Sequence, residues 1–336
     1  MHNHAVDGGL LPFVSVRTSE HGPDLPSAVE FGDPERHDPG RAVAERDVSL
    51  AHLAFVAVCL IWGTTYLAIR VALESVPVLL VAGLRWMTAG VLLCAVLLAM
   101  GRRLPPRRLW GALILLGVLM NIVGNGFVVF AQQYVASGLT AVLIAVTPFW
   151  SALLERWLPN GERFTTRALI GLVVGFAGIV VLVWPTLSQG GAGGRAFAVG
   201  VVAIQLACIG WVCGTSYARR HELGADPLPS AALQMVFSGV MLLVAATAHG
   251  DWGHLSFTPR TSAAMAYLSV VGSLVAYSAY IYAIQHLRLS LVSLYAYVNP
   301  IIAVALGTLL LGEPLSSRIV LAAGLVFAGT GIVGRK

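Results

Sequence analysis

A single arginine, Arg85, lies well inside an apolar stretch of this sequence, VAGLRWMTAG at residues 81–90. A guanidinium group in hydrocarbon is costly, so it must face a partner, water or the interior of a helix bundle. Two interpretations stay open. Arg85 contacts an anionic substrate or forms a gate, or it is a hub of structural hydrogen bonds whose head group reaches out toward the membrane surface.

Two asparagines form a second polar group within an apolar stretch. Asn121 and Asn125 are four residues apart, so on a helix they share one face. Gly117 and Gly124 lie nearby and allow close approach of another helix. We expect the asparagines to line a central cavity; the alternative is hydrogen bonding between helices with no contact to a substrate.

Aromatic residues could line a substrate pathway with apolar rings that carry hydroxyl groups, which suits amphipathic solutes. The alternative for any one of them is plain packing or a place in the aromatic belt at the membrane surface. The candidates are Trp62, Tyr66, Trp211, Tyr217, Tyr277 and Tyr280, with Tyr297 as a further possibility.

Chemistry that needs acids, clustered histidines or a metal is poorly supported. Glu155, Glu162 and Glu313 fall at or near helix ends, and His286 lies near the end of its stretch, so proton coupling is not supported. The loop HGDWGH at residues 249–254 would be the place for an enzyme acting on lipid-linked substrates, but no matching residues accompany it. The four cysteines fit buried helix positions. We therefore predict no catalytic residue, no metal and no cofactor.

The elements that position these residues are membrane-spanning helices. Of 336 residues, 57% are hydrophobic and 11% charged, against roughly 25% charged in soluble domains. Ten apolar stretches are long enough to cross about 30 Å of hydrocarbon as helices. They run over residues 52–70, 77–100, 109–132, 138–157, 168–185, 197–217, 229–248, 262–284, 290–311 and 317–334.

Charge predicts the tail and the orientation. Nine of the 16 acidic residues lie in the first 48 residues, so we predict a disordered cytoplasmic tail at 1–49. If the N-terminus is inside, fifteen basic residues fall in the tail from Arg36 onward and in the connectors on that side. The opposite connectors hold only Arg70, Arg195, Arg260 and Arg318. This bias predicts that both termini are cytoplasmic.

The chain repeats itself. A shift of 151 residues places GTTY (63–66) on GTSY (214–217), and a shift of 152 places Pro148 on Pro300 and Asn121 on Ser273. Gln234 is the approximate counterpart of Arg85 and keeps a polar group without the charge. Because each unit holds five spans, the second must be inserted upside down. The sequence therefore predicts an all-α integral membrane protein with ten transmembrane helices in two inverted five-helix repeats, at 50–187 and 196–336.

Matched prolines and one asparagine complete the candidate set. Pro148 and Pro300 occupy equivalent places in the fourth and ninth spans, where proline removes a helical hydrogen bond and can kink the helix. They are candidate hinges or merely fixed bends. Asn299, directly before Pro300, is a candidate for the substrate pathway.

Several motifs resemble a known family. WGTTYLAIRVALES (62–75), GLRWMTAG (83–90), VGNG (123–126) and SLYAYVNPIIAVALGTLLLGEPLS (293–316) are similar to the EamA family of the drug/metabolite transporter superfamily, especially its YedA/PecM-type exporters. The resemblance covers about residues 50–334. It implies a ten-helix inverted-repeat fold in the inner membrane and export of metabolites, amino acids or toxic compounds.

The predicted function is secondary transport of small molecules by alternating access across a bacterial inner membrane. The alternatives are a membrane-embedded enzyme and a non-transporting sensor, and the sensor would tolerate substitution of Arg85, Asn121 and Asn125. The expected partners are a small-molecule substrate and the lipid bilayer, with no nucleic acid, in a monomer or homodimer. ATP-driven transport is disfavoured because no phosphate-cradling Gly-Lys-Ser/Thr loop is present.

Overall fold

The structure is a computed structural model that describes residues 39–158, 166–188, 191–221, 226–287, 289–292 and 294–334. The chain divides into two compact units, Met1–Ala42 and Val43–Lys336, and the second holds all the features discussed below. The predicted tail falls mostly on residues 1–38, which lie outside the described residues. Helix α1 begins at Pro39, inside the stretch predicted as tail.

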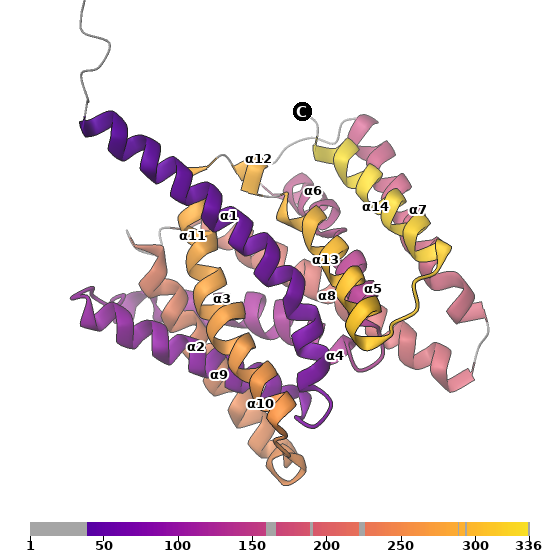
Figure 1. Cartoon of the computed structure of the whole chain (residues 1–336), viewed down its shortest axis with the longest axis horizontal. Coiled ribbons are helices and arrows are strands. Elements are labelled where there is room, and N and C mark those ends of the chain that lie inside the picture. Colours follow the sequence, from indigo (N-terminus) through magenta and orange to yellow (C-terminus); the bar gives the residue numbers. More distant parts are fainter. Residues whose placement is uncertain are drawn as a thin grey trace, which may run out of the picture. The chain divides into compact units, whose positions relative to one another are not determined.

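The described chain is all-helical (Figure 1). Seven of its described helical spans are long and apolar enough to cross a membrane, and three shorter apolar helices complete the ten predicted spans. The elements are α1 (Pro39–Ala72), α2 (Val78–Ala99), α3 (Trp110–Leu116), η2 (Gly117–Gly126), α4 (Phe127–Ala131), α5 (Ser137–Ile144), α6 (Thr147–Trp157), α7 (Thr166–Ser188), α8 (Gly191–Arg220), α9 (Pro227–His249), α10 (Pro259–Ala266), η4 (Tyr267–Val275), α11 (Ala276–His286), α12 (Leu289–Val292), α13 (Tyr295–Leu311) and α14 (Ser317–Gly334), with short 3₁₀ turns η1 (Arg107–Leu109) and η3 (Asp251–His254).

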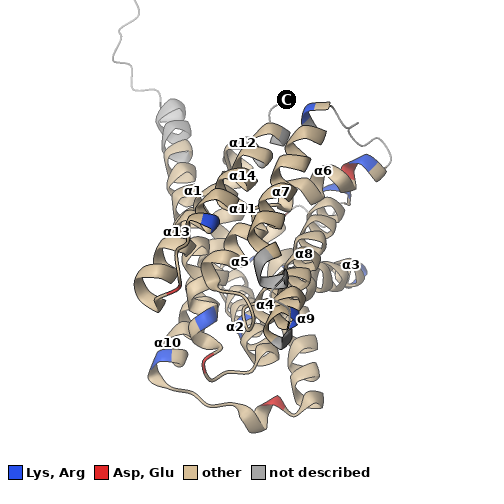
Figure 2. Ribbon diagram, turned by 90° about the vertical axis from the view of Figure 1, so that its right-hand side faces the viewer, with Lys and Arg blue, Asp and Glu red and all other residues tan. Residues whose placement is uncertain are grey.

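Charge is sparse along these helices. Figure 2 shows long uncharged stretches of ribbon, with most of the charged residues toward helix ends and loops. Large apolar side chains such as Trp184 and Leu309 are exposed on the outer helices. In a soluble protein such a surface would be a liability, whereas in a bilayer it faces lipid. The fold is that of an integral membrane protein.

Two pairs of spans are interrupted internally, which the hydropathy pattern did not reveal. The third span contains the π-helical segment η2, and the eighth contains the π-helical segment η4 at the corresponding place. The fourth span is divided into α5 and α6, and the ninth into α12 and α13. Extended π-helix is rare and tends to occur at functional sites. Its recurrence in both halves marks spans three and eight as counterparts in structure as well as in sequence.

Equivalent spans of the two halves pack on each other. Helix α2 packs against α9, α5 against α13, and α7 against α14. These are the second and seventh, fourth and ninth, and fifth and tenth spans. An element that packs on its own repeat counterpart lies at a pseudo-two-fold axis, so these contacts confirm the inverted five-helix repeat.

Glycines permit the closest of these crossings. On α14, a side-chain carbon at Gly329 would meet the backbone of Gly171 and Gly175 on α7; on α7, one at Gly178 would meet the Ala322 carbonyl on α14. Gly178 and Gly329 are related by the 151-residue shift. The glycines of α7 therefore pack within the chain, and small residues bring the two backbones together.

The GTTY and GTSY motifs also form the same local structure. The Thr64 hydroxyl donates to the Ile61 carbonyl at 2.7 Å, and the Thr215 hydroxyl donates to the Val212 carbonyl at 3.1 Å. The 151-residue shift relates both donors and both acceptors. Between the two predicted repeats lie residues 188–195, SQGGAGGR, and this connector is shorter than the repeat bounds imply because α8 begins at Gly191; residues 189–190 lie outside the described part.

Candidate functional site

Arg85 lies in α2, seven residues after the helix begins, which is about 10 Å of rise along the axis. Its side chain is only 4% exposed. Nε donates to the Ser273 hydroxyl at 2.7 Å, and Nη2 donates to the Gly272 carbonyl at 3.4 Å. The guanidinium carbon lies 4.8 Å from the centre of the Trp86 ring. The head group is thus held against η4 in the second repeat and does not extend to the membrane surface.

A second pair of polar contacts mirrors the first across the repeats. Gln234 in α9 donates from Nε2 to Asn121 Oδ1 in η2 at 3.4 Å, and Asn121 Nδ2 donates to the Ser238 hydroxyl at 2.9 Å. Gln234 is the counterpart of Arg85, and Asn121 is the counterpart of Ser273. Arg85 in the second span therefore hydrogen-bonds to the eighth span, and Gln234 in the seventh span hydrogen-bonds to the third. The charge is present in only one of the two pairs.

The π-helical segments place the acceptors of these bonds. Asn121 lies in η2 and Ser273 in η4, and they are 0% and 1% exposed. The Gly117 backbone lies next to the Gln234 carbonyl, and Gly272 lies next to Thr65 and Arg85. A side chain at either glycine would push the partner helix away. Each wide turn, flanked by glycine, therefore lets a short polar side chain meet the opposite repeat.

Aromatic rings gather around Trp62 of α1. Its ring centre lies 5.0 Å from that of Tyr295, 5.2 Å from that of Tyr280 and 6.3 Å from that of Trp211. Tyr277 adds a further ring 6.3 Å from Tyr280. Such spacings are typical of edge-to-face and tilted aromatic contacts. Helices α1, α8, α11 and α13 each contribute, so both repeats build this cluster.

Tyr66 connects the aromatic cluster to the buried arginine. It lies one helical turn after Trp62 on α1 and interacts electrostatically with Arg85 and Tyr295. The Tyr277 hydroxyl interacts with the Gln234 side chain by hydrogen bonding. Charged, amide and phenolic groups thus converge with indole rings at one place between the halves. We call the set Trp62, Tyr66, Arg85, Asn121, Trp211, Gln234, Ser273, Tyr277, Tyr280 and Tyr295 the seam site.

Eight residues singled out from the sequence lie in the seam site, and three do not. Asn125 donates to the Met120 carbonyl of its own π-helical segment at 3.0 Å. Tyr217 stacks on His221, with ring centres 4.0 Å apart, near the end of α8. When the amide of Asn299 is oriented so that its nitrogen faces the neighbouring acceptors, it donates to the carbonyls of Cys59 at 3.0 Å and Tyr295 at 3.1 Å. It joins α13 to α1 and bonds the backbone of Tyr295, whose ring belongs to the aromatic cluster.

Sequence reasoning missed Tyr295 and assigned Gln234 only as a counterpart. Tyr295 and Tyr297 are two residues apart on α13, so they point to different faces. Tyr297 packs on Phe327 of α14 with ring centres 5.8 Å apart, away from Trp62. The signal that could have identified Gln234 was present: it is a polar residue in an apolar stretch, close to the position matched to the intramembrane arginine.

The two candidate hinge prolines have different surroundings. Pro148 lies in the first turn of α6, directly after the interruption of the fourth span, where its missing N–H leaves no gap in the helix. Pro300 lies inside the continuous helix α13. The interruption of the ninth span falls earlier, between α12 and α13. The matched sequence positions therefore have unmatched local structures, and a hinge role for either stays a prediction.

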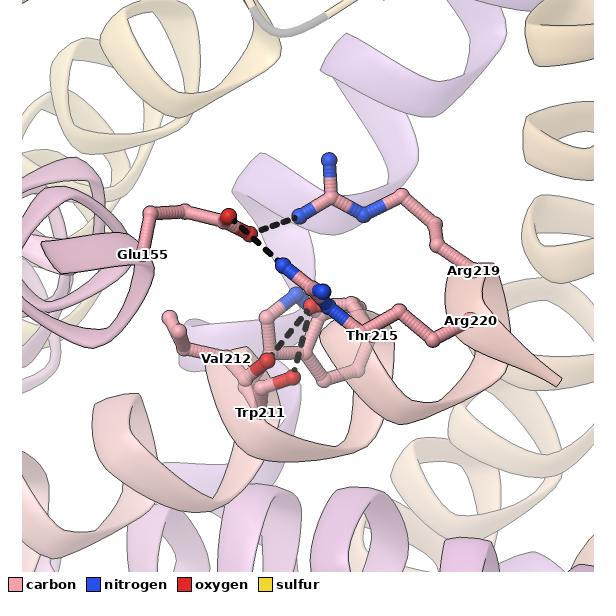
Figure 3. A network of polar contacts seen from close by, with 6 residues as sticks. All are labelled: Glu155, Trp211, Val212, Thr215, Arg219 and Arg220. Atoms are coloured by element: carbon pink, nitrogen blue, oxygen red, sulfur yellow. Dashed lines mark hydrogen bonds and ion pairs between the residues drawn. The ribbon is translucent and has the colours of Figure 1, made fainter. Parts of the chain in front are cut away.

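Ion pairs tie the two repeats together at the end where α6 and α8 finish (Figure 3). Glu155 of α6 accepts from Arg219 at 3.0 Å and from Arg220 at 2.9 Å, both on α8. Figure 3 shows Thr215 one turn below them on α8. At the same end, Arg102 follows α2 and pairs with Asp226 before α9 at 2.9 Å.

Different contacts tie the repeats together at the other end of α2. Glu74 pairs with Arg260 at 3.2 Å, and the Ser75 hydroxyl donates to Thr261 Oγ1 at 3.0 Å. Glu313, after α13, accepts from the Ser137 backbone N–H at 2.7 Å and from the Gly138 N–H at 3.0 Å. This carboxylate caps the start of α5, where N–H groups lack partners within the helix. The seam site lies between two sets of contacts that join the repeats.

The loop considered for an enzyme forms a local structure only. His249 contacts Asp251 at 2.6 Å, and the Trp252 indole donates to the Thr247 hydroxyl at 2.9 Å. Within the described residues, no group of three or more His, Cys, Asp or Glu side chains could hold a metal ion.

Known proteins resemble this chain over most of its length. The EamA-like transporter family matches it twice, over residues 49–184 and 198–335. The inner membrane transporter YedA of Escherichia coli (strain K12), whose name carries the word uncharacterized, is 38% identical over 276 residues, covering 81% of this chain and 87% of that protein. The transporter YvbV of Bacillus subtilis (strain 168), also called uncharacterized, is 27% identical and covers 83% and 88%.

A solved structure titled only as the crystal structure of a protein matches the fold. Its TM-score is 0.60 at 19% sequence identity, and the match covers 84% of this chain and 96% of that one. At this identity the likeness supports the arrangement of helices alone. The two family matches correspond to the two sets of five spans.

Proposed function

This chain belongs to the EamA-like transporter family, and from that premise we propose that it exports small metabolites, amino acids or amphipathic toxic compounds by alternating access. The observation that supports this most is the seam site, where each repeat supplies one half of two mirrored hydrogen-bonded pairs. In inverted-repeat transporters, substrates bind near the midplane between the repeats. The seam site draws residues from both repeats, which supports a binding site between them.

Alternating access requires contacts that close each end in turn, and the two sets of inter-repeat ties suit this role. The Glu155 pairs and the Arg102–Asp226 pair lie at one end. The Glu74–Arg260 pair and the Glu313 cap lie at the other. Helix α2 separates them by its 22 residues, about 33 Å at 1.5 Å per residue. We propose that rocking of one repeat against the other breaks these two sets alternately.

The proposal includes a location and an orientation. A related protein is named as an inner membrane transporter. We propose the same location here, with the Glu155 end and both termini in the cytoplasm, because the basic residues concentrate in the connectors on that side. The test is the accessibility of tags placed at the C-terminus and in the loop of residues 250–258 in intact cells. A tag at the C-terminus that is reached from outside would reverse the orientation.

The transport function is tested by a broad screen. The protein is produced in a host lacking related exporters, and resistance to amino acids, their analogues and amphipathic toxins is measured. Compounds that respond are then followed in proteoliposomes. We expect at least one compound to accumulate less in cells and to cross the proteoliposome membrane only when protein is present. If no compound in the panel changes accumulation in either system, the transport proposal fails.

Weakening the ion pairs at one end is expected to shift the equilibrium between the conformation open at that end and the conformation open at the other. In Glu155→Gln, both ion pairs with α8 are weakened, so the Glu155 end opens more often. Each exposed pair contributes up to about 1 kcal/mol, so we expect maleimide labelling at Thr215→Cys to rise about two- to fivefold. The measurement uses purified protein in which Cys59, Cys94, Cys208 and Cys213 are replaced by alanine.

A matched variant at the opposite end is the control. In Glu74→Gln, the pair with Arg260 is weakened, so the other end opens more often and labelling at Thr215→Cys slows. Equal labelling rates in the wild type, Glu155→Gln and Glu74→Gln would mean that these pairs do not close the ends.

A further inference from the structure

The buried guanidinium of Arg85 has no countercharge in the described structure. The side chains of five carboxylates are described, and each is engaged at a helix end or connector: Glu74 with Arg260, Glu155 with Arg219 and Arg220, Asp226 with Arg102, Asp251 with His249, and Glu313 with the start of α5. The partners that Arg85 does have, Ser273 and the Gly272 carbonyl, are neutral. A buried charge without an opposite charge is expensive to keep.

Hydrogen-bond donors also exceed acceptors around this head group. A guanidinium carries five N–H donors, and within the described residues two of those of Arg85 have acceptors. Beside it, the indole nitrogen of Trp86 is buried and has no acceptor in the described structure. The ring of the same tryptophan lies against the guanidinium at 4.8 Å. A cation–π contact contributes about 0.5–2 kcal/mol but accepts none of these donors.

From these two observations we infer that the substrate carries a carboxylate that binds Arg85, together with an aromatic or branched apolar body. The planar fork of arginine matches the two oxygens of a carboxylate. This inference rests on the proposed transport function and specifies the class of substrate for the same site.

The charge count distinguishes a carboxylate from a phosphate. Arg85 is the single arginine that lies well inside an apolar stretch of the sequence, and its approximate counterpart Gln234 is neutral. One positive charge balances a monoanion, whereas a phosphate dianion would leave one negative charge uncompensated in hydrocarbon. The described acids are all engaged elsewhere, so no carboxylate stands ready to balance a substrate ammonium group. A simple organic acid therefore fits this site better than a zwitterion.

The rest of the substrate would meet the aromatic part of the seam site. Tyr66 interacts electrostatically with Arg85, and Trp62, one turn before it on α1, lies within 5.2 Å of both Tyr280 and Tyr295 between ring centres. Flat rings with hydroxyl groups accept apolar bodies while tolerating a polar edge. A carboxylate at Arg85 would extend its apolar part toward these rings.

The test measures binding separately from transport. Purified protein in nanodiscs is titrated with 3-phenylpropionate and 4-methylpentanoate, each against its own amide, and with phenylalanine as the zwitterion, with tryptophan fluorescence as the readout. We expect at least one acid to bind about tenfold or more tightly than its amide, as an ionic hydrogen-bonded pair does. Arg85→Gln should abolish this preference, and Arg85→Lys should retain part of it.

Arg70→Gln serves as the matched control, because Arg70 is an arginine near the end of α1 that donates to the Gln132 carbonyl outside the seam site. It should keep the preference for the acid. The inference is overturned if no acid binds more tightly than its amide, if phenylalanine binds more tightly than the acids, or if folded Arg85→Gln keeps the preference. If an acid binds with the expected preference but nothing crosses proteoliposomes, the transport function fails and the inference about the site stands.

Discussion

Asn121→Leu is expected to lower both stability and transport, because leucine has a similar size but neither donor nor acceptor. The change removes the bond from Gln234 and the bond to Ser238, and it leaves the Gln234 amide buried with an unpaired donor toward η2. Interhelical bonds in membranes are individually modest, but with the stranded amide the cost is about 1–2 kcal/mol. If this cost falls on the conformation that carries substrate, transport falls by about tenfold, because about 1.4 kcal/mol corresponds to a factor of ten.

Asn125→Leu supplies the matched control four residues away. Its amide bonds only the Met120 carbonyl of the same segment, so we expect a smaller loss of thermal stability and transport above half of the wild-type rate. Both variants are compared by thermal unfolding in detergent and by uptake of a responding compound into proteoliposomes. If Asn121→Leu transports as well as wild type, the contacts of Asn121 between the repeats are not needed for transport and the assignment of the seam site is wrong.

Gly329→Ala is the second change with a large expected effect. A methyl group there would lie 2.5 Å from both the Gly171 carbonyl oxygen and the Gly175 nitrogen. These are backbone atoms and cannot turn aside, so α7 and α14 must separate. Overpacking of this kind costs about 1–3 kcal/mol. We expect a clear drop in unfolding temperature and in the yield of monodisperse protein.

The control is Gly331→Ala on the same helix, where a methyl group meets nothing within 4 Å among the described atoms. Alanine favours helix over glycine by about 1 kcal/mol, so this variant should be as stable as wild type or slightly more so. Equal unfolding temperatures for Gly329→Ala and Gly331→Ala would show that the α7–α14 crossing adjusts freely.

The sequence predicted the helices, their inverted repetition and much of the seam site. Ten apolar stretches and an odd-numbered repeat were sufficient for the fold. The shift of 152 matched Asn121 with Ser273, Gln234 was the approximate counterpart of Arg85 at an offset of 149, and the structure places these four residues in two mirrored contacts. Comparing the two halves of the sequence could identify these residues, because polar side chains within the membrane are few and must be hydrogen-bonded.

Other parts of the site could not be predicted, for physical reasons. The π-helical segments have the same apolar composition as ordinary helix, so hydropathy does not distinguish them. Choosing Tyr295 over Tyr297 requires the rotation of α13, which depends on packing against α1 and α14. The Glu155 ties depend on which connectors meet in space, and one carboxylate at a helix end is compatible with several basic partners.

The single guanidinium in the seam site also constrains how the protein could have arisen. Two identical five-helix units, paired upside down, would place the same residue at both matched positions. Arginine at both would bring two like charges into hydrocarbon across the axis, while glutamine at both would supply none. A lone arginine opposite a glutamine requires that the two units differ. Joining both units in one gene allows this difference, because each copy can then mutate on its own. The charge asymmetry therefore marks a step that a symmetric ancestral dimer could not have taken.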